Sequence, residues 1–393
     1  MLGYSPPDPI SIRLLHSEKL SRPLSVARRP PLKGIQSLRG VAALLVIFLH
    51  LFYWLSQTFE TMREQPVWTC FGECGVDLFF VISGFIILYV TPAPFVSCGD
   101  QARFLIRRFA RIYPTYWAIS LPLFLLVLWK PVGFPVMKHH DQFFSSLFLL
   151  PQVNFPLLAV AWTLTFELYF YFMASFIFYL GRRARMVAFI AWFIAVIGAN
   201  LLHLDASPNP WLHLVFSPFS TEFILGTFVA GFLLTGSVSL KGSHALRIVG
   251  IALLIIFLAG TVHAKWRSLS FLATDTHLRI LVYGVPSVVI VWAVLQMEFQ
   301  GQWNYIKSIA FLGDRSYSIY LLHVPIFAFV FKIAAGQHLN RTLFQTCLFV
   351  LVALVGLAAS VELSYRCIEV PAQALGKRLA PHKIRPPAAG LSI

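Results

Sequence analysis

Charged side chains are scarce in this sequence. Asp, Glu, Lys and Arg make up 12% of the 393 residues, whereas hydrophobic residues make up 58%. Soluble globular chains average about 25% charged residues, so the composition argues against an ordinary soluble domain. The mean hydropathy is +0.74, and apolar runs of roughly twenty residues, the length of a membrane helix, recur along the chain. These properties predict an all-α fold: a polytopic integral membrane helical bundle forming one domain.

Several catalytic and binding motifs are also missing. The sequence contains no GxSxG motif, which argues against an esterase-type nucleophile. It has no Gly-rich phosphate loop and no His/Cys cluster with zinc spacing, so no metal is predicted. Among the five cysteines, Cys70 and Cys74 lie close together, but their helical spacing disfavours a disulfide.

The first 34 residues lack a sustained apolar run, so we do not interpret them as a secretory signal. We expect residues 1–34 and 373–393 to be mobile cytoplasmic tails on either side of a transmembrane domain over 35–372. The net charge is +15, but the basic residues lie at the ends of apolar segments. That position marks cytoplasmic loops and argues against a nucleic-acid partner.

Apolar segments predict ten membrane spans, and short connections between several of them predict antiparallel neighbours. The spans are roughly 36–56, 74–91, 113–130, 159–180, 186–203, 212–235, 246–262, 280–296, 315–334 and 342–364. A cytoplasmic N-terminus would place 23 of the 31 basic residues on the inner side. This bias predicts that both termini are cytoplasmic, as an even number of spans requires, in a protein of the cell (inner) membrane. No internal repeat suggests a transporter built from two related halves.

An arginine and a histidine share the first predicted span. His50 follows Arg39 by three helical turns, so it lies on nearly the same face and roughly 16 Å deeper, near the centre of a core about 30 Å thick. One interpretation is a snorkelling arginine anchor and a hydrogen-bonded core histidine. Ionisable groups in lipid are costly, however, and this favours a functional pair.

Other ionisable residues are predicted at similar depth on other spans. Glu167, Glu222 and His323 each lie about eight residues into a span, counted from the side at which that span enters the membrane. Asp77 is predicted near the outer end of the second span. Together with His50, these residues indicate a polar cavity inside the bundle, and a proton or ion pathway is the alternative interpretation.

An arginine cluster opens the third predicted span in "RFLIRRFARIYPTYW". It contains Arg103, Arg107, Arg108 and Arg111 within nine residues, and guanidinium groups match the geometry of phosphate oxygens. The alternative is a topology signal that contacts anionic lipid headgroups. Four arginines at the mouth of a polar cavity favour a substrate that carries phosphate.

Seven short segments follow one another along these spans: "SLRGVAALLVIFLH", "GVDLFFVISGFII", "RFLIRRFARIYPTYW", "WTLTFELYFY", "TEFILG", "GDRSYSIYLLH" and "IEVP". In this order they resemble membrane acyltransferase family 3, polytopic proteins that O-acylate sugars of cell-surface polysaccharides. The resemblance covers about residues 34–372 and is closest to the branch that acetylates exopolysaccharides. We expect no soluble acyltransferase domain after the bundle, so acceptor recognition would fall to the loops.

The resemblance implies a donor site at the cytoplasmic end. Arg39 and His50 match the family's Arg and His on the first helix. Arg108 and Arg111 match its RxxR element, which is thought to serve acyl-CoA. With Arg107 beside them, these arginines are the predicted cofactor-binding residues, and acetyl-CoA is the predicted acyl donor.

The resemblance also implies catalytic residues on later helices: Glu167 on the fourth, and Ser316, Tyr317 and His323 on the ninth. A sugar hydroxyl is a poor nucleophile and needs a base, for which His50 is the best candidate. Glu167 would orient that imidazole, and Tyr317 or Ser316 would donate to the developing oxyanion. A covalent acyl-His50 intermediate is the alternative.

The sequence therefore predicts a membrane O-acyltransferase that moves an acyl group, most simply acetyl, onto a glycan hydroxyl. Predicted partners are a glycan or lipid-linked oligosaccharide acceptor, membrane lipids and polysaccharide export machinery. Transfer of succinyl or another acyl group is the nearest alternative. A transporter with a buried proton relay and an inert export-complex subunit are alternatives from other classes, and the arginine cluster favours the enzyme.

Overall fold

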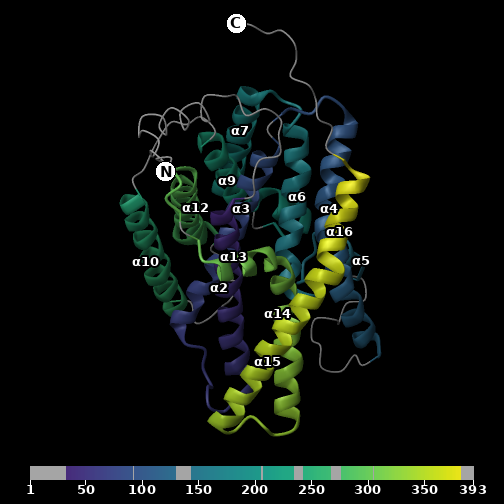
Figure 1. Cartoon of the computed structure of the whole chain (residues 1–393), viewed down its shortest axis with the longest axis vertical. Helices are drawn as coiled ribbons and strands as arrows, with labels where there is room; N and C mark the ends of the chain where they lie inside the picture. The colour runs from purple at the N-terminus through teal and green to yellow at the C-terminus, as the bar shows by residue number, and fades with distance from the viewer. Residues whose placement is uncertain are drawn as a thin grey trace, which may run out of the picture. The chain divides into compact units, whose positions relative to one another are not determined.

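The structure is a computed structural model that describes residues 32–91, 93–129, 143–204, 207–233, 242–266, 276–303 and 305–381. Within these ranges the chain forms helices and no strand, which confirms the predicted all-α fold. Leu32–Ala380 form one compact unit, drawn in Figure 1. Most of the predicted tails, residues 1–31 and 382–393, lie outside the described residues.

In the described part of the chain, nine helical segments are long and apolar enough to cross a membrane, which confirms a polytopic membrane protein. They are Lys33–Thr58 (α2), Val67–Val90 (η1, Val67–Glu73, with α3, Cys74–Val90), Ala159–Ile177 (η4, Ala159–Ala161, with α6, Trp162–Ile177), Arg182–Leu201 (α7), Pro210–Leu233 (α8, Pro210–Phe216, with α9, Phe219–Leu233), Gly242–Val262 (in α10, Gly242–Trp266), Ile280–Phe299 (η6, Ile280–Gly284, with α12, Val285–Phe299), Ser316–Gly336 (α14) and Leu343–Leu379 (α15, Leu343–Ser364, with η7, Tyr365–Glu369, and α16, Val370–Leu379).

The remaining predicted span, 113–130, falls on α4, a helix over Cys98–Trp129. Three short helices complete the described elements: α5 (Phe143–Leu147), α11 (Thr276–Arg279) and α13 (Lys307–Asp314). Helical structure also continues through α16, beyond the predicted domain end at residue 372. The predicted loop over 131–158 lies partly outside the described residues.

Local sequence explains where some of these helices begin. In α15 the Thr342 hydroxyl accepts a hydrogen bond from the Gln345 amide (3.2 Å), and the Gln345 side chain accepts one from the Thr342 amide (3.1 Å). This reciprocal capping box satisfies two amides that the helix leaves unpaired. At α2 the Glu298 carboxylate of α12 accepts the backbone N–H of Gly34 (2.9 Å), so a distant residue supplies the negative charge that a helix N-terminus favours.

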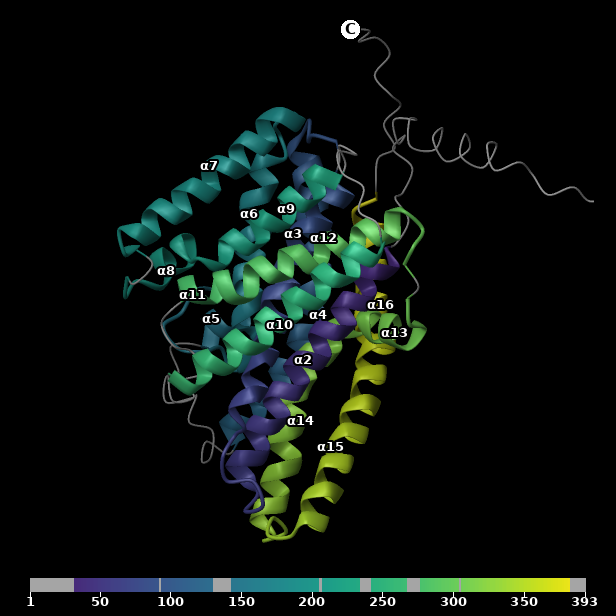
Figure 2. The ribbon, with the colours of Figure 1, turned by 90° about the vertical axis from the view of Figure 1, so that its left-hand side faces the viewer.

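Hydrogen bonds between helices fix the directions of α2, α14 and α15. At one end of the bundle the Asn340 side-chain amide donates to the Thr58 carbonyl at the end of α2 (2.7 Å). At the other end, Arg315 before α14 pairs with Glu362 near the end of α15 (2.6 Å). Helices α2 and α14 therefore run parallel and α15 returns beside them, as Figure 2 shows. The start of α2, the start of α14 and α16 share one end of the bundle, as the predicted orientation requires.

The second span begins earlier than predicted, and this changes the depth of Asp77. The span starts at Val67 through η1, whereas the apolar run predicted a start at residue 74. A Cβ placed on Gly75 would lie 2.5 Å from the Ala42 carbonyl oxygen, so this part of α3 packs beside α2 between Arg39 and His50. The prediction that Asp77 lies near the outer end is therefore wrong. Asp77 is deep in the bundle and fully buried.

Two glycines allow the backbones of α3 and α9 to touch. A Cβ on Gly84 would overlap the backbone of Phe223, and one on Gly226 would overlap the carbonyl oxygen of Val81. Small residues permit such close packing between membrane helices. Because α3 forms one wall of the cavity described below, this contact fixes the position of that wall.

We expect Gly84→Val to destabilise the protein, because its new side chain would meet backbone atoms that cannot move aside. Overpacking in a core costs about 1–3 kcal/mol or more. Thermal unfolding of the detergent-solubilised protein would measure the effect. Gly198→Val on α7 is the matched control, since a Cβ there meets no atom within 4 Å. Equal unfolding temperatures for the two variants would contradict the proposed close contact.

Candidate active site

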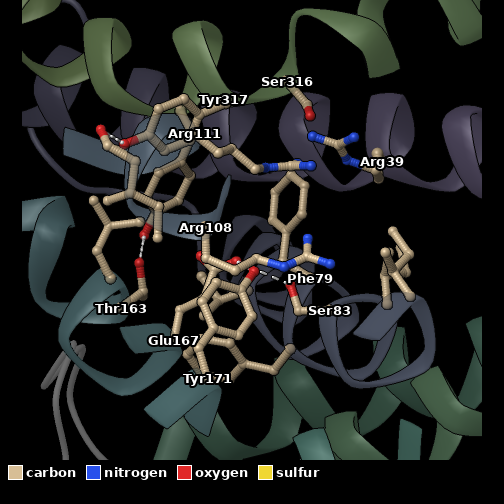
Figure 3. Close-up of a pocket in the computed structure, with 17 residues that line it drawn as sticks. Arg39, Phe79, Ser83, Arg108, Arg111, Thr163, Glu167, Tyr171, Ser316 and Tyr317 are labelled. Carbon is tan, nitrogen blue, oxygen red and sulfur yellow. Dashed lines mark hydrogen bonds between the residues drawn. The ribbon is translucent and has the colours of Figure 1, made fainter. Parts of the chain in front are cut away.

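A cavity opens inside the bundle between α2, α3, α4, α6 and α14 (Figure 3). It contains about 710 Å³ of empty space, including the part that is open to solvent. The residues that line it are Arg39, Val76, Phe79, Phe80, Ile82, Ser83, Ile86, Arg108, Arg111, Ile112, Thr163, Leu164, Glu167, Tyr171, Ser316, Tyr317 and Tyr320. The cavity therefore brings together six of the residues predicted from the sequence: Arg39, Arg108, Arg111, Glu167, Ser316 and Tyr317.

One face of α3 forms the apolar side of the cavity. Val76, Phe79, Ser83 and Ile86 follow the three- and four-residue spacing that places side chains on one helical face. They are half-buried, whereas most of their neighbours on α3 are buried. The exposure of this stripe is therefore exposure to the cavity.

Three guanidinium groups converge on the cavity from two helices, Arg39 on α2 and Arg108 and Arg111 on α4 (Figure 3). Arg108 lies over the rings of Phe104 (5.3 Å) and Tyr171 (5.4 Å). Within the described part of the chain, neither Arg108 nor Arg111 donates a hydrogen bond to a protein group. These donors therefore remain available for an anion inside the cavity.

The fourth-helix carboxylate belongs to the arginine end of the cavity. Glu167 accepts hydrogen bonds from the hydroxyls of Tyr171 and, at 3.3 Å, Ser83. The His50 imidazole is instead held at Nδ1 by the Val46 carbonyl oxygen of its own helix (2.9 Å). The structure thus gives His50 a backbone orienter and does not support Glu167 in that role.

The two ninth-helix residues differ in their hydrogen bonds. The Tyr317 hydroxyl donates to the Ile112 carbonyl oxygen at 2.7 Å. The Ser316 hydroxyl is fully buried and has no hydrogen-bond partner among the described residues. Figure 3 places it beside Arg39. Ser316 therefore has a hydroxyl to offer a bound group, and it offers it at the arginine end.

The two predicted histidines form a pair. The rings of His50 and His323 have centroids 4.8 Å apart and lie edge to face. Nδ1 of His323 lies 3.2 Å from the Ile319 carbonyl oxygen, so both imidazoles use Nδ1 to bond the backbone one turn earlier. Each ring then carries its lone pair on Nε2. His323 is fully buried, and its Nε2 has no hydrogen-bond partner among the described residues.

The histidine pair lies beside the cavity and is not part of its lining. Tyr320 connects the two, because it lines the cavity and its ring centroid is 5.9 Å from that of His323. The predicted convergence of His50 with His323 is therefore present, whereas Glu167 lies apart with the arginines. Arg107 also lies apart: its guanidinium donates to the Ala380 carbonyl oxygen after α16 (2.8 Å), and it does not line the cavity.

The sequence matches the profile of an acyltransferase domain family over residues 32–361. The chain belongs to acyltransferase family 3. It is therefore an acyltransferase, and the family resemblance predicted from its motifs is confirmed. No solved structure is significantly similar to the chain.

Named relatives come from several sources. The chain is 32% identical to the exopolysaccharide production protein ExoZ of Rhizobium meliloti, over 74% of this chain and 88% of that protein. It is 26% identical to the O-acetyltransferase OatA of Staphylococcus aureus, over 88% of this chain but only 58% of OatA. A putative acetyltransferase of Acidianus two-tailed virus is also 26% identical, over 74% of this chain and 82% of the viral protein.

The motifs of this acyltransferase hide one acidic residue that the sequence-based site omitted. Glu369, in the "IEVP" segment, is buried and accepts hydrogen bonds from the Ser318 hydroxyl (2.8 Å) and the Gln373 side chain (3.2 Å). It also accepts the Ser318 amide in the first turn of α14 and interacts electrostatically with Arg39 and Arg111. An acidic residue close behind a long apolar run was the available signal.

The charges around the cavity do not cancel. Three arginines, Arg39, Arg108 and Arg111, face two carboxylates, Glu167 in the lining and Glu369 behind it. If all five groups are ionised, one positive charge remains in a largely buried space. Such an excess favours binding of an anion.

A second polar cluster lies outside the cavity. Arg279 donates to both carboxylate oxygens of Asp77 (3.1 and 2.8 Å) and to the Glu73 carboxylate (3.0 Å). Glu222 is fully buried near this group, and neither of its oxygens has a hydrogen-bond partner among the described residues. The prediction that Asp77 and Glu222 share one polar cavity with His50 is therefore wrong: they do not line it, and Arg279, which sequence analysis passed over, pairs with Asp77.

This cluster predicts opposite responses to two conservative changes. No donor stabilises an ionised carboxylate at position 222, so we expect Glu222→Gln to leave stability almost unchanged. Asp77→Asn removes a buried partner of Arg279, and breaking a buried pair costs about 3–5 kcal/mol. Thermal unfolding of both variants in detergent tests this contrast. A larger loss for Glu222→Gln than for Asp77→Asn would contradict it. Among the described residues, no group of His, Cys, Asp or Glu is arranged to hold a metal ion.

Proposed function

We propose that this membrane protein transfers an acetyl group from acetyl-CoA to a hydroxyl of a cell-surface or exported polysaccharide, in the inner membrane. The observation that carries the proposal is the convergence of three guanidinium groups on one cavity, next to a pair of imidazoles. The names of the relatives support the chemistry, since ExoZ acts in exopolysaccharide production and OatA is an O-acetyltransferase.

The arginine end of the cavity would bind the phosphates of coenzyme A. Arg108 and Arg111 would donate charge-assisted hydrogen bonds to phosphate oxygens, with Arg39 opposite them and the Ser316 hydroxyl beside Arg39. Ser316 therefore serves the donor in this proposal, in place of the predicted oxyanion. Glu369 would hold Arg39 and Arg111 from behind.

The distance from the arginines to the imidazoles matches the length of the donor. Eleven residues of α2 separate Arg39 from His50, which is a rise of about 16 Å. An extended pantetheine arm is roughly 15–20 Å long, similar to twelve residues of helix rise. The nucleotide can thus stay at the end of the bundle while the thioester reaches the histidine pair.

At the histidine pair, His50 would act as the base. Its Nδ1–H donates to Val46, which leaves the Nε2 lone pair to accept the proton of the acceptor hydroxyl. The hydroxyl oxygen bonds to the thioester carbonyl carbon, the carbon–sulfur bond breaks, and the proton ends on the sulfur of coenzyme A. His323, whose Nε2 is also unprotonated in this arrangement, provides a second place for that proton.

The acceptor is a glycan or a lipid-linked oligosaccharide that approaches the histidine pair from the end of the bundle opposite the arginines. Polysaccharide export machinery is the expected neighbour, because it would present such acceptors at the membrane. This arrangement keeps the two substrates on separate sides and lets them meet at His50.

Deletion of the gene tests the proposed function. NMR spectra of the cell-surface glycans of the deletion strain should lose the signals of O-acetyl esters, and a plasmid copy should restore them. Loss of succinyl signals instead would assign the alternative acyl group. Glycans with unchanged acyl esters would contradict the proposal.

A further inference from the structure

Phe79 stands in the middle of the cavity, on the path from the arginines to the histidine pair. Figure 3 shows its ring in the space between Arg108 and Arg111. Its ring centroid is 6.0 Å from that of Tyr320, and the two rings lie edge to face. Tyr320 in turn contacts His323. The Phe79–Tyr320 contact therefore lies between the two halves of the site.

The two rings of this contact are held differently. The Tyr320 hydroxyl is bonded to the Thr163 hydroxyl (3.0 Å) and the Val160 carbonyl oxygen (2.9 Å), so its position is fixed by the start of α6. Phe79 has no polar anchor and is half-buried. It packs against both hydrophobic clusters of the bundle, the large one around α3, α6 and α9 and the smaller one around α2, α14 and α15. The width of the passage is thus set by the Phe79 ring.

We propose that Phe79 determines the length of the acyl group that this enzyme transfers. The inference rests on the proposed function, because it takes the donor to be an acyl-CoA with its phosphates at the arginines. The acyl group lies at the far end of the arm from those phosphates, so it reaches the Phe79–Tyr320 contact first. A methyl group passes with little displacement, whereas a propyl chain overlaps the ring. The site therefore selects acetyl over longer acyl groups.

The chain-length preference of variants tests this proposal. Membrane vesicles that contain the protein and its glycan acceptor are supplied with acetyl-CoA or butyryl-CoA, and ester formation on the glycan is measured. We expect Phe79→Ala to raise the butyryl-to-acetyl ratio at least tenfold, since one methylene in a pocket is worth about 10–200-fold. Phe79→Leu should raise it less. Phe71→Ala is the matched control, because Phe71 is a half-buried phenylalanine of the same span outside the cavity, and it should leave the ratio unchanged.

The outcomes separate the two proposals. If the wild-type protein transfers neither acyl group from coenzyme A, the proposed function is wrong and the inference falls with it. If it transfers acetyl but Phe79→Ala keeps the wild-type ratio, only the role of Phe79 is wrong. An equal rise in Phe71→Ala would also overturn that role, because the effect would then be general loosening. If Phe79→Ala does not accumulate, the ratio for Phe79→Leu decides the question in the same way.

Discussion

His50→Ala is expected to abolish glycan acylation while the protein stays folded and inserted. General base catalysis contributes about 10²–10⁴-fold to a reaction rate, and a covalent acyl carrier at the same position would be lost altogether. The imidazole makes its hydrogen bond to its own helix through Nδ1, so its removal should spare the packing of α2. Acylation of glycans in a complemented deletion strain measures the effect.

His213→Ala provides the matched control for this variant. His213 lies on α8, is exposed and does not line the cavity, so its replacement should leave acylation intact. Retention of most activity by His50→Ala would remove His50 from the chemistry, whether as base or as acyl carrier. An inactive His50→Ala protein that also fails to accumulate would be compared with His50→Gln, for which we expect accumulation without activity.

The double variant Arg108→Gln/Arg111→Gln should weaken acetyl-CoA binding by more than tenfold. Each lost charge-assisted hydrogen bond is worth about 1.5–3 kcal/mol, and about 1.4 kcal/mol is a factor of ten in affinity. Titration of acetyl-CoA against the purified protein gives the dissociation constant directly. Higher salt should weaken binding to the wild type more than to the variant, because fewer charges remain in the variant to be screened.

Arg107→Gln is the control that tests the geometry of this cluster. Arg107 carries the same charge next to Arg108 but bonds to the Ala380 carbonyl oxygen outside the cavity. Its replacement should change the affinity for acetyl-CoA only slightly. An affinity that falls equally in Arg107→Gln and in the double variant would mean that the cluster acts through its net charge at the membrane surface and not as a site.

The membrane helices were predictable because their physical signal is local. Runs of apolar residues and basic residues at their ends depend only on neighbours along the chain, and all ten predicted spans fall on helices. The depth of His50 relative to Arg39 followed from helical rise alone. The boundary of the second span was wrong because the 3-10 segment η1 extends it through a sequence that contains Glu73 and less apolar character.

The pairing of side chains between helices was less predictable, because it depends on helix rotation. Arg107 and Arg108 are adjacent in sequence but face different neighbours, since consecutive residues point about 100° apart on a helix. Only the packing of α4 against α16 on one side and α6 on the other decides which of them enters the cavity. The partner of Asp77, Arg279, follows it by 202 positions along the chain, and no local pattern links the two.

The hydrogen bond that orients His50 was missed for a different reason. Sequence reasoning sought a carboxylate from another helix, whereas the Val46 carbonyl oxygen one turn earlier supplies the contact. Glu167, the expected orienter, is occupied by Tyr171 and Ser83 near the arginines. Both residues of that network were visible in the quoted motifs, but only the packing of α3 against α6 reveals that they meet.

Transfer of a labelled acetyl group is the most direct test of the shared donor and histidine site. Inside-out membrane vesicles with the wild-type protein are given acetyl-CoA that is radiolabelled in its acetyl group, and alkali-labile label in the glycan is counted. We predict label in the glycan with the wild-type protein, none with His50→Ala, and recovery only at much higher acetyl-CoA with Arg108→Gln/Arg111→Gln. Equal labelling by the wild type and His50→Ala, or no labelling from acetyl-CoA by the wild type, would contradict this account.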